Sequence, residues 1–434
     1  MIKLKVRVLA LLTVLCLMPA GLSCGFSGVA QDKEVNNYSF IKDVSAVVHK
    51  GDIEYSQETL KDIKNHVNIY MGNGLIGGCI DYLGSMGNPD NRKSVSKTFI
   101  SHKGFYGRSG DGKECIVPVY TLDFDVTCKG KKLSLNQLEV KDYKQKLDIY
   151  EGVARTSFTI YDGGKKIAAV SMEQWMSQYM RNLYANKVDI ESFNSEQVEF
   201  EPKFKVLNDY SFEGTQYTTE SNSSERNERI IYSIKTNTSS AELVFIPAKG
   251  YKSKSITKDS AGYIYSVDKK TSFNIDVLSI ANNEELVAND VLKKYDSIAY
   301  EEHIKLHKKW YSGFWKESLV SFGGDTPFLK IWLRGNYYFA ITESAFKSVP
   351  FVPHGLSGHA WSYFFPQDYS YVYQNYLTAN HRGMADSTIM YWYEHLEDAK
   401  AYTKKYLKTE GAFFPWTPPF YNYDSFNKNS IPGQ

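Results

Sequence analysis

The hydrophobic and polar positions of the chain alternate with a period of two over most of its first two thirds. Short alternating segments, separated by Gly, Asn, Ser and Lys turns, run from about residue 35 to 280. They include Tyr120 to Val126, Val198 to Leu207, Arg229 to Thr236 and Tyr263 to Ile280. This period is typical of strands buried on one face. So many strands in series predict sheet packed on sheet, in an antiparallel β super-sandwich larger than an immunoglobulin-like module. The polar stretch 218–227 is expected to be an exposed loop.

The period changes to three and four near residue 283. Asn283 can cap a helix, and the next segment places four ring-bearing residues on one helical face, which we expect to dock on the sandwich: His307, Trp310, Phe314 and Trp315. Asp325-Thr326-Pro327 predicts another helix start, followed at helical spacing by Phe328, Ile331, Trp332, Phe339 and Phe346. Further helices are expected from about Gln367 to Ala379 and from Met384 to Leu407. The pattern predicts an α+β multidomain protein with a sandwich over 35–280, linker helices over 283–320 and helical hairpins over 325–434.

The first thirty residues have the features of an export signal. Three basic residues precede an apolar run from Val8 to Met18 and then small residues. The run is too short to span a bilayer as a mature helix. Two cleavage interpretations stay open: Gly28-Val29-Ala30 fits a small-x-small peptidase site, and Leu22-Ser23-Cys24 fits a bacterial lipoprotein box in which Cys24 carries lipid. We expect the protein in the periplasm or at the cell surface, in the second case on a lipid anchor.

Composition narrows the classes of partner. Lys and Arg number 51 against 49 Asp and Glu, with no basic run, so nucleic acid is not an expected partner. Aromatic residues make up 15% of the chain, and their faces stack on sugar rings as well as filling cores. Beyond the signal only Cys79, Cys115 and Cys128 remain, which are interpreted as buried thiols or as one disulfide and one thiol. No nucleophile elbow, phosphate-binding loop or dinucleotide fingerprint is found, and no cofactor is expected; the glycine-rich stretch 71–78 is interpreted as a tight sheet turn.

Candidate chemistry concentrates in a loop between two predicted helices. A sugar site needs an aromatic platform and two-pronged polar groups, and Trp361, Gln367 and Asp368 supply these types. The alternative for Asp368 is a carboxylate that satisfies the free N–H groups of a helix start. His354 and His359 lack a third ligand at metal spacing, so no metal site is expected. A second candidate is the aromatic turn from Gly411 to Trp416, which could equally end a helix against the core.

Four stretches in order resemble the six-hairpin glycosidases, especially glycoside hydrolase family sixty-five and, more distantly, family ninety-five. They are Met71-Gly72-Asn73-Gly74 with Gly77; Tyr143-x-Gln145-x-Leu147-Asp148 with Gly152; His307-x-x-Trp310 with Phe314-Trp315; and the run from Gly355 through Gly358-His359, Phe364-Phe365 and Asp368 to Phe414-Pro415-Trp416. The resemblance covers residues about 60 to 420. It implies that the helical hairpins begin an (α/α)6 barrel and that His359, Trp361, Gln367, Asp368 and Trp416 bind substrate.

The resemblance also implies a mechanism and its limits. Family sixty-five phosphorylases have Phe-Trp-Asp-x-Glu where this chain has Phe364-Phe365-Pro366-Gln367-Asp368, so phosphorylase activity and sugar specificity cannot be carried over. The family's general acid is a Glu late in the barrel, and the chain ends at Gln434 before reaching it. We therefore expect an incomplete barrel, a chain that is inactive alone, and an inverting reaction in which the whole enzyme hydrolyses a glycoside. Export favours water over phosphate as the nucleophile, because a sugar phosphate formed outside the cell is easily lost.

Two other classes remain as rivals. A non-catalytic surface glycan-binding lipoprotein would also be exported and aromatic. A polysaccharide lyase would combine similar architectures, but it usually places the helical part before the sheets, which is the reverse of the order here.

Overall fold

The structure is a computed structural model of the 434-residue chain. It describes residues 43–61, 63, 66–86, 100–109, 114–135, 137–193, 197–212, 215–281, 288–320, 324, 326–342, 356 and 366–414.

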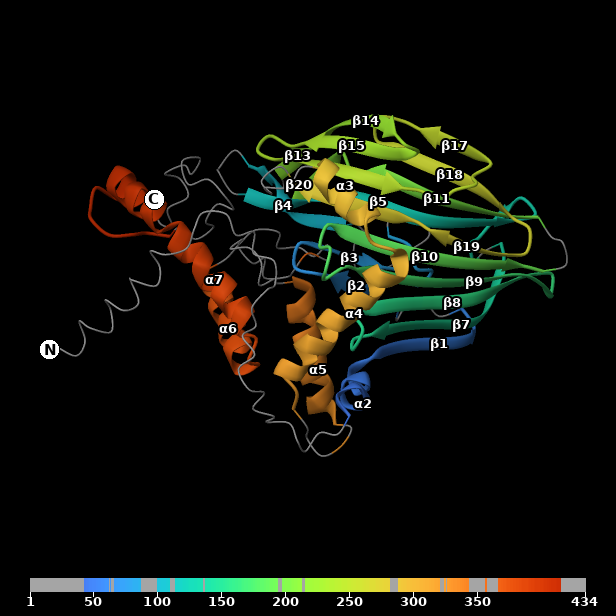
Figure 1. Ribbon diagram of the computed structural model, residues 1–434, viewed down its shortest axis with the longest axis horizontal. Coiled ribbons are helices and arrows are strands. Elements are labelled where there is room, and N and C mark those ends of the chain that lie inside the picture. Colours follow the sequence, from blue (N-terminus) through green and yellow to red (C-terminus); the bar gives the residue numbers. More distant parts are fainter. Residues whose placement is uncertain are drawn as a thin grey trace. The chain divides into compact units, whose positions relative to one another are not determined.

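The described strands form two large antiparallel sheets (Figure 1). The larger sheet has ten strands, nine of them in the order β1-β7-β8-β9-β10-β20-β16-β15-β14, with β19 paired to β10. Their bounds are β1 (Ile53–Thr59), β7 (Glu139–Asp148), β8 (Val153–Asp162), β9 (Lys165–Met176), β10 (Leu183–Ser192), β14 (Glu220–Arg226), β15 (Arg229–Lys235), β16 (Ser240–Ile246), β19 (Lys270–Asn274) and β20 (Asp276–Ala281).

The smaller sheet has eight strands, seven of them in the order β17-β18-β11-β5-β4-β3-β2, with β6 paired to β5. Their bounds are β2 (Ile69–Gly72), β3 (Ile76–Ile80), β4 (Ile100–Arg108), β5 (Glu114–Cys128), β6 (Lys131–Lys132), β11 (Val198–Val206), β17 (Ser253–Ile256) and β18 (Ser260–Val267). A separate hairpin pairs β12 (Asp209–Phe212) with β13 (Thr215–Thr218).

The main core lies between the two large sheets. Phe204 of β11 stacks on Tyr232 of β15 and Phe245 of β16, with ring centroids 5.0 and 5.4 Å apart. Such aromatic pairs add to the hydrophobic gain of burying each ring. The predicted β super-sandwich is therefore confirmed. The thiols of Cys79, Cys115 and Cys128 are buried and unpaired by disulfides, which confirms the interpretation of all three as small core residues.

One predicted loop is a strand. Residues Glu220–Arg226, expected within an exposed loop, form β14 at the edge of the larger sheet, paired with β15. All of them are exposed or half-buried. An edge strand without a core-facing side has no apolar alternation to reveal it, so its polar composition looked like a loop.

Helices frame the sandwich and follow it in the chain. Before it lie α2 (Val44–Val48) and the short 3₁₀ turn η1 (His49–Gly51). After it come α3 (Ala288–Asp296), α4 (Tyr300–Glu317), α5 (Pro327–Thr342), α6 (Pro366–Thr378), α7 (Arg382–Glu394), α8 (Leu396–Tyr402) and the π-helical turn η2 (Thr403–Leu407). The predicted cap Asn283 and the residue Phe346 lie outside the described residues. The fold class, a sandwich followed by the first helices of a helical region, is as predicted.

Helix α5 buries a different stripe from the one that the hydrophobic spacing indicated. The Thr326 hydroxyl accepts a hydrogen bond from the Leu329 N–H and starts the helix. Its buried residues are Leu329, Leu333, Asn336, Tyr337, Ala340 and Ile341. Phe328 and Ile331, in contrast, are 73% and 69% exposed. The helix is apolar on both sides, and only one side faces the sandwich and α4.

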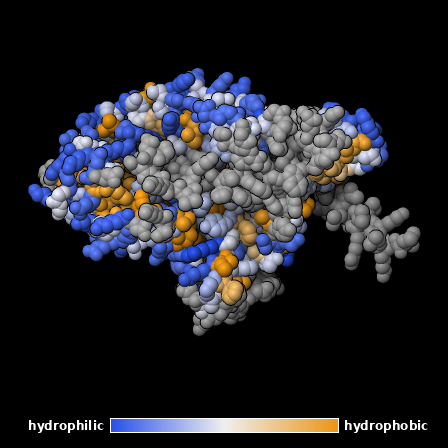
Figure 2. Space-filling model, turned by 180° about the vertical axis from the view of Figure 1, so that it is seen from behind, coloured by the Kyte–Doolittle hydropathy of each residue, from blue (hydrophilic) through white to orange (hydrophobic). Residues whose placement is uncertain are grey.

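Further apolar residues are exposed on the two helices that follow. They are Leu377 of α6 and Ile389, Met390 and Tyr393 of α7. Figure 2 shows hydrophobic side chains on the surface among the hydrophilic ones. None of the described helices is both long enough and apolar enough to cross a bilayer.

Candidate functional site

The turn between β7 and β8 contacts α4. Gly152 has φ of +67°, and a Cβ added there would lie 2.0 Å from the Tyr311 ring. His307 accepts a hydrogen bond from the Gln178 N–H and donates one to the Gly152 carbonyl, each 3.2 Å long. The Trp315 indole donates to the Ile149 carbonyl at 3.0 Å. Two motifs of the family resemblance, far apart in sequence, are thus the two sides of one interface.

The predicted docking face of α4 is largely confirmed. His307, Phe314 and Trp315 are buried, whereas Trp310 is only half-buried and stacks on Phe314. Burial lowers the pKa of His307 to about 4, because the interior disfavours the imidazolium. The ring is therefore neutral at pH 7, with one nitrogen accepting and the other donating a hydrogen bond. This histidine is a structural part of the interface.

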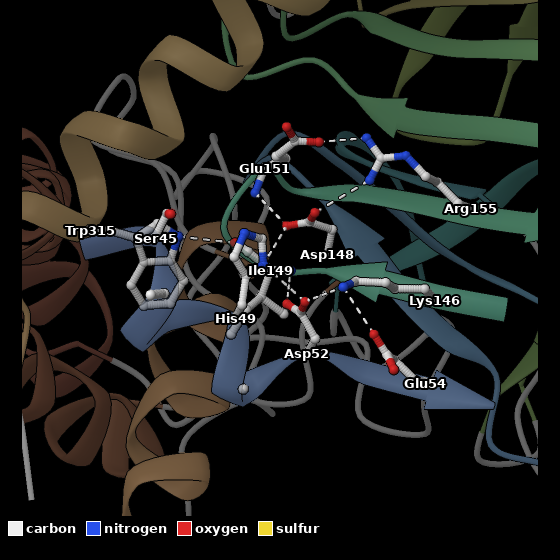
Figure 3. Close-up of polar contacts among 12 residues, drawn as sticks. Ser45, His49, Asp52, Glu54, Lys146, Asp148, Ile149, Glu151, Arg155 and Trp315 are labelled. Carbon is white, nitrogen blue, oxygen red and sulfur yellow. Dashed lines mark hydrogen bonds and ion pairs between the residues drawn. The ribbon is translucent and has the colours of Figure 1, made fainter. Parts of the chain in front are cut away.

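A charged network surrounds the start of the same turn (Figure 3). The His49 ring lies 3.0 Å from the Asp52 carboxylate and 3.6 Å from that of Asp148. Lys146 pairs with Asp52 at 2.7 Å, and Arg155 lies 3.4 Å from Asp148. The two carboxylates also accept the backbone N–H groups of residues 149 and 151. Burial, and next the charge of Asp52, raise the pKa of Asp148 above its ordinary value.

The same cluster contains a group of possible metal ligands. Among the described residues, the side-chain ligand atoms of His49, Asp52 and Asp148 all lie within 4.8 Å of one another. Their carboxylates already have cationic partners in Lys146 and Arg155 and backbone donors in the turn. These contacts account for the cluster as an ion-pair network that fastens the 3₁₀ turn η1 to β7.

The glycine-rich stretch 71–78 is the predicted tight turn, and it docks on the end of α5. The Gly74 N–H donates to the Ile341 carbonyl at 3.1 Å. A Cβ at Gly72 would lie 2.3 Å from that same oxygen, so only glycine allows this approach. The Asn73 side chain holds the turn in shape by donating to the Ser177 and Arg181 carbonyls, both at 2.8 Å. The sandwich therefore fixes the point at which α5 ends.

A cluster of buried polar side chains joins the hairpin of α6 and α7 to the preceding helices. Asn336 of α5 accepts a hydrogen bond from the Ser318 hydroxyl and contacts the His381 ring nitrogen at 2.8 Å. The His381 ring also stacks on Phe314 of α4, with centroids 4.1 Å apart. Nearby, Phe339 of α5 meets Tyr376 of α6 edge to face. Contacts later in α5 are therefore made with earlier residues of the α6 segment, so the two helices run antiparallel. The end of α5 and the start of α6 consequently lie at the same end of this helix pair.

The predicted site residues divide by where they fall. Gln367 and Asp368 are the second and third residues of α6, at its first turn. Val372, one turn further, packs on Tyr391 of α7. Trp392, next to it, meets the Phe414 ring edge to face at 4.8 Å. The start of α6, the end of α7 and the aromatic turn that precedes Trp416 are therefore connected at one end of the helical region.

His359, Trp361 and Trp416 lie outside the described residues, as do His354 and the side chains of Gln367 and Asp368. The position of Asp368 in a first helical turn fits both a sugar-binding carboxylate and a helix-start carboxylate. The sequence interpretation missed Asn336 and His381, which hold the hairpin. The available signal for Asn336 was a polar residue three and four positions from the apolar Leu333, Phe339 and Ala340 of α5.

A large antiparallel β-sandwich followed by a docked linker helix and antiparallel helical hairpins defines the class of the six-hairpin glycosidases. Residues 69–285, half of the 434-residue chain, match the N-terminal domain of glycosyl hydrolase family 65. The chain belongs to this family.

A solved structure shares the fold of this chain. A putative kojibiose phosphorylase from human microbiome superposes with a TM-score of 0.71 over 88% of this chain, at 16% identity. A bacterial glucoamylase complexed with acarbose covers 81% of the chain at 12% identity and a TM-score of 0.43. The chain spans 52% and 54% of the lengths of these two proteins. No curated protein matches the chain.

Proposed function

We propose that this protein is an exported carbohydrate-active enzyme, an inverting glycoside hydrolase that acts on an oligo- or polysaccharide. The family membership supports a glycosidic substrate. The observation that carries the proposal is a series of contacts that runs from the sandwich to the aromatic turn before Trp416. The sandwich turn at Asn73 abuts the end of α5, Phe339 of α5 meets Tyr376 of α6, and Val372 of α6 and Phe414 both contact the last turn of α7. Loops at the mouth of a rigid scaffold are where binding groups are usually built.

In the proposed reaction a carboxylic acid protonates the glycosidic oxygen as its bond to the anomeric carbon breaks, while a second carboxylate takes a proton from the water molecule that attacks this carbon from the opposite face. An inverting pair of carboxyl groups stands roughly 6.5–9.5 Å apart to leave room for that water. Asp368 is proposed to hold sugar hydroxyls, with Gln367 beside it and Trp361 and Trp416 as stacking platforms. The general acid is expected in the half of the fold that these residues do not span.

Export is proposed from the N-terminal residues, and water is preferred to phosphate as the nucleophile for that reason. If Cys24 carries lipid, a Cys24→Ser variant will lose incorporation of labelled palmitate and leave the membrane fraction. Cleavage after Ala30 would instead release a soluble protein that lacks label in both forms.

The catalytic proposal is tested with the full protein as its gene encodes it. Disaccharides and oligosaccharides of different linkages are supplied with and without inorganic phosphate, and NMR follows the first anomer released. We expect phosphate-independent release of the inverted anomer. Asp368→Asn should lower turnover at least a hundredfold, while Asp398→Asn should change it less than twofold, because Asp398 is 54% exposed and contacts only the neighbouring His395 in the described part of the chain.

Each alternative has its own outcome. Sugar phosphate formed only with added phosphate would replace hydrolysis by phosphorolysis, and a retained anomer would exclude inversion. Equal effects of the two substitutions would show that the site lies elsewhere. Glycan binding without turnover by any form of the chain would favour the non-catalytic glycan-binding protein.

A further inference from the structure

The outer face of the larger sheet carries a groove of about 330 Å³, lined by residues of β7, β8, β9, β10 and β19. Helix α3 and the start of α4 pack on another part of this face, over Trp175 of β9. Ser171 lies four residues from Trp175 on the same side of β9, which places it about 13 Å away. In Figure 1, β8 and β9 continue well beyond α4. The groove is therefore separate from the contact between the sandwich and the helices.

The strand register builds the groove from two adjacent cross-strand rows. The first row is Ser157, Ser171, Asp189 and Ser272; the second is Thr159, Ala169, Glu191 and Lys270. The residues between these rows, Phe158, Val170 and Ile190, are buried in the sandwich core. Alternation thus leaves small and hydroxyl-bearing side chains on the groove floor and carboxylates along one side.

Thr159 is a buried polar residue that faces this groove. It is only 6% exposed, yet it lines the groove, and its hydroxyl bonds no other residue in the described part of the chain. Ser157 and Ser171 likewise make no side-chain hydrogen bond there. Buried hydroxyls in proteins are as a rule hydrogen-bonded. The Thr159 hydroxyl therefore takes its partner from the groove, where either water or a ligand can supply it.

The charges around the groove select the kind of occupant. Asp142, Asp189 and Glu191 are set against Lys270, and the two rows continue on β7 into Lys144, opposite Ser157, and Lys141, opposite Thr159, so charges of both signs border the groove. Asp189 accepts a hydrogen bond from the Ser272 hydroxyl, and no ion pair reaches Asp142 or Glu191 among the described residues. These carboxylates do not converge as the metal-sized cluster at His49 does. With charges of both signs around it and no converging carboxylates, the groove favours neither anions nor a divalent cation, and it offers both donors and acceptors to hydroxyl groups.

We propose that this groove is an accessory binding site for a segment of a neutral oligosaccharide. The carboxylates of Asp189 and Glu191 accept hydrogen bonds from sugar hydroxyls, and the hydroxyls of Ser157, Thr159 and Ser171 donate to or accept from them. The choice of a carbohydrate rests on the proposed function. The groove is distinct from the proposed site at Asp368. It would keep the protein bound to a polysaccharide while another segment of that polysaccharide is hydrolysed at the Asp368 site.

Native-gel affinity electrophoresis of the full chain tests the proposal. The gels contain a neutral glucan, mannan or xylan, or a sulfated polysaccharide, and Ca²⁺ is titrated separately by calorimetry. Thr159→Val removes the hydroxyl at nearly constant volume, and Glu191→Gln removes one charge. Ser171 is exposed, so leucine at this position fills the groove without changing the packing of the sandwich core. The control is Glu220→Gln, exposed on β14 at the far side of the same sheet.

We expect at least one neutral polymer to retard the wild-type chain. The dissociation constant for that polymer should rise at least tenfold in Ser171→Leu and in the Thr159→Val/Glu191→Gln double variant. In the control it should change less than twofold. Retardation that persists in these groove variants, retardation by the sulfated polymer alone, binding of Ca²⁺ at the groove, or no retardation at all would overturn the proposal. Asp368→Asn should retain groove binding. If Asp368→Asn alone abolishes retardation, the accessory site is refuted while the proposed function stands.

Discussion

Replacement of Gly152 by alanine tests whether the β7–β8 turn and α4 are fitted to each other as closely as the structure indicates. The residue has φ of +67°, in the left-handed region, where an L side chain costs roughly 1–2 kcal/mol. Its new Cβ would lie 2.0, 2.4 and 2.7 Å from three atoms of the Tyr311 ring. Tyr311 is 1% exposed and cannot swing into solvent, so overpacking adds about 1–3 kcal/mol. The expected loss of unfolding free energy is about 2–5 kcal/mol.

Gly163→Ala is the matched control for this substitution. Gly163 has φ of +55° in the β8–β9 turn, and a Cβ there meets nothing within 4 Å. It therefore carries the backbone cost alone, about 1–2 kcal/mol. Equilibrium urea unfolding, followed by the fluorescence of the buried Trp315 and Trp175, measures both variants.

A double-mutant cycle isolates the contact itself. Tyr311→Leu removes the ring that the added methyl group of Gly152→Ala would strike, so the double variant should be about 1–3 kcal/mol more stable than the sum of the two single changes predicts. Gly152→Ala and Gly163→Ala of equal stability, or additive effects in the cycle, would refute the close packing of α4 on the turn.

Three further outcomes are expected. The pKa of His307 is 6.5 in the unfolded chain and about 4 in the folded protein, so its contribution to stability is complete above pH 6.5 and falls as the pH drops toward 4. Measured by urea unfolding and relative to His307→Gln, the wild type should lose about 2 kcal/mol of unfolding free energy between pH 8 and pH 5. Asp276 has the opposite sign: burial raises its pKa from 3.8 to about 6, so its contribution is complete below pH 3.8 and is lost above 6. Asp276→Asn, whose amide can accept from the Asn186 N–H and donate to the Tyr295 hydroxyl, should be more stable than the wild type at pH 7.5 but not at pH 4. The chain should bind a hydrophobic dye or self-associate, and Phe328→Ser with Ile331→Ser should reduce either signal without lowering the urea midpoint; a compact monomer that binds no dye would contradict the exposed apolar face.

The sandwich could be predicted because most of its strands have one core-facing side, which leaves a period of two in the sequence. The α4 stripe could be predicted for the same kind of reason, since His307, Phe314 and Trp315 lie on one face of a helix whose other face is polar. β14 could not, because an edge strand with no buried side carries no such signal. The buried side of α5 could not either, because Phe328 and Leu329 belong to two apolar faces and the period alone does not select between them.

The candidate site was predictable to a smaller extent. The residue types around Asp368 indicate a sugar-binding loop, and the start of α6 falls where the sequence predicted it. Asn336 and His381, which join the helices, are 45 residues apart, and no local pattern links them. The accessory groove depends on which residue of β8 stands opposite Ser171 and Ala169. That register is set by bulges and turn lengths in three dimensions, which alternation along one strand does not specify.

The motifs that carry the family resemblance in the sandwich would act on the proposed site through position. Gly72 and Gly74 meet the Ile341 carbonyl at the end of α5, and Gly152 meets Tyr311 of α4, so each glycine sets the distance between a sheet turn and a helix. None of these residues offers a group that could donate a proton to a leaving oxygen. A change at Gly72 or Gly152 should therefore reduce unfolding free energy and activity together, because it displaces the helix that leads to the site. A change at Asp368 should reduce activity alone. Since the same loss of activity has these two separable causes, stability measured beside turnover distinguishes the residues that support the site from those that contact the sugar.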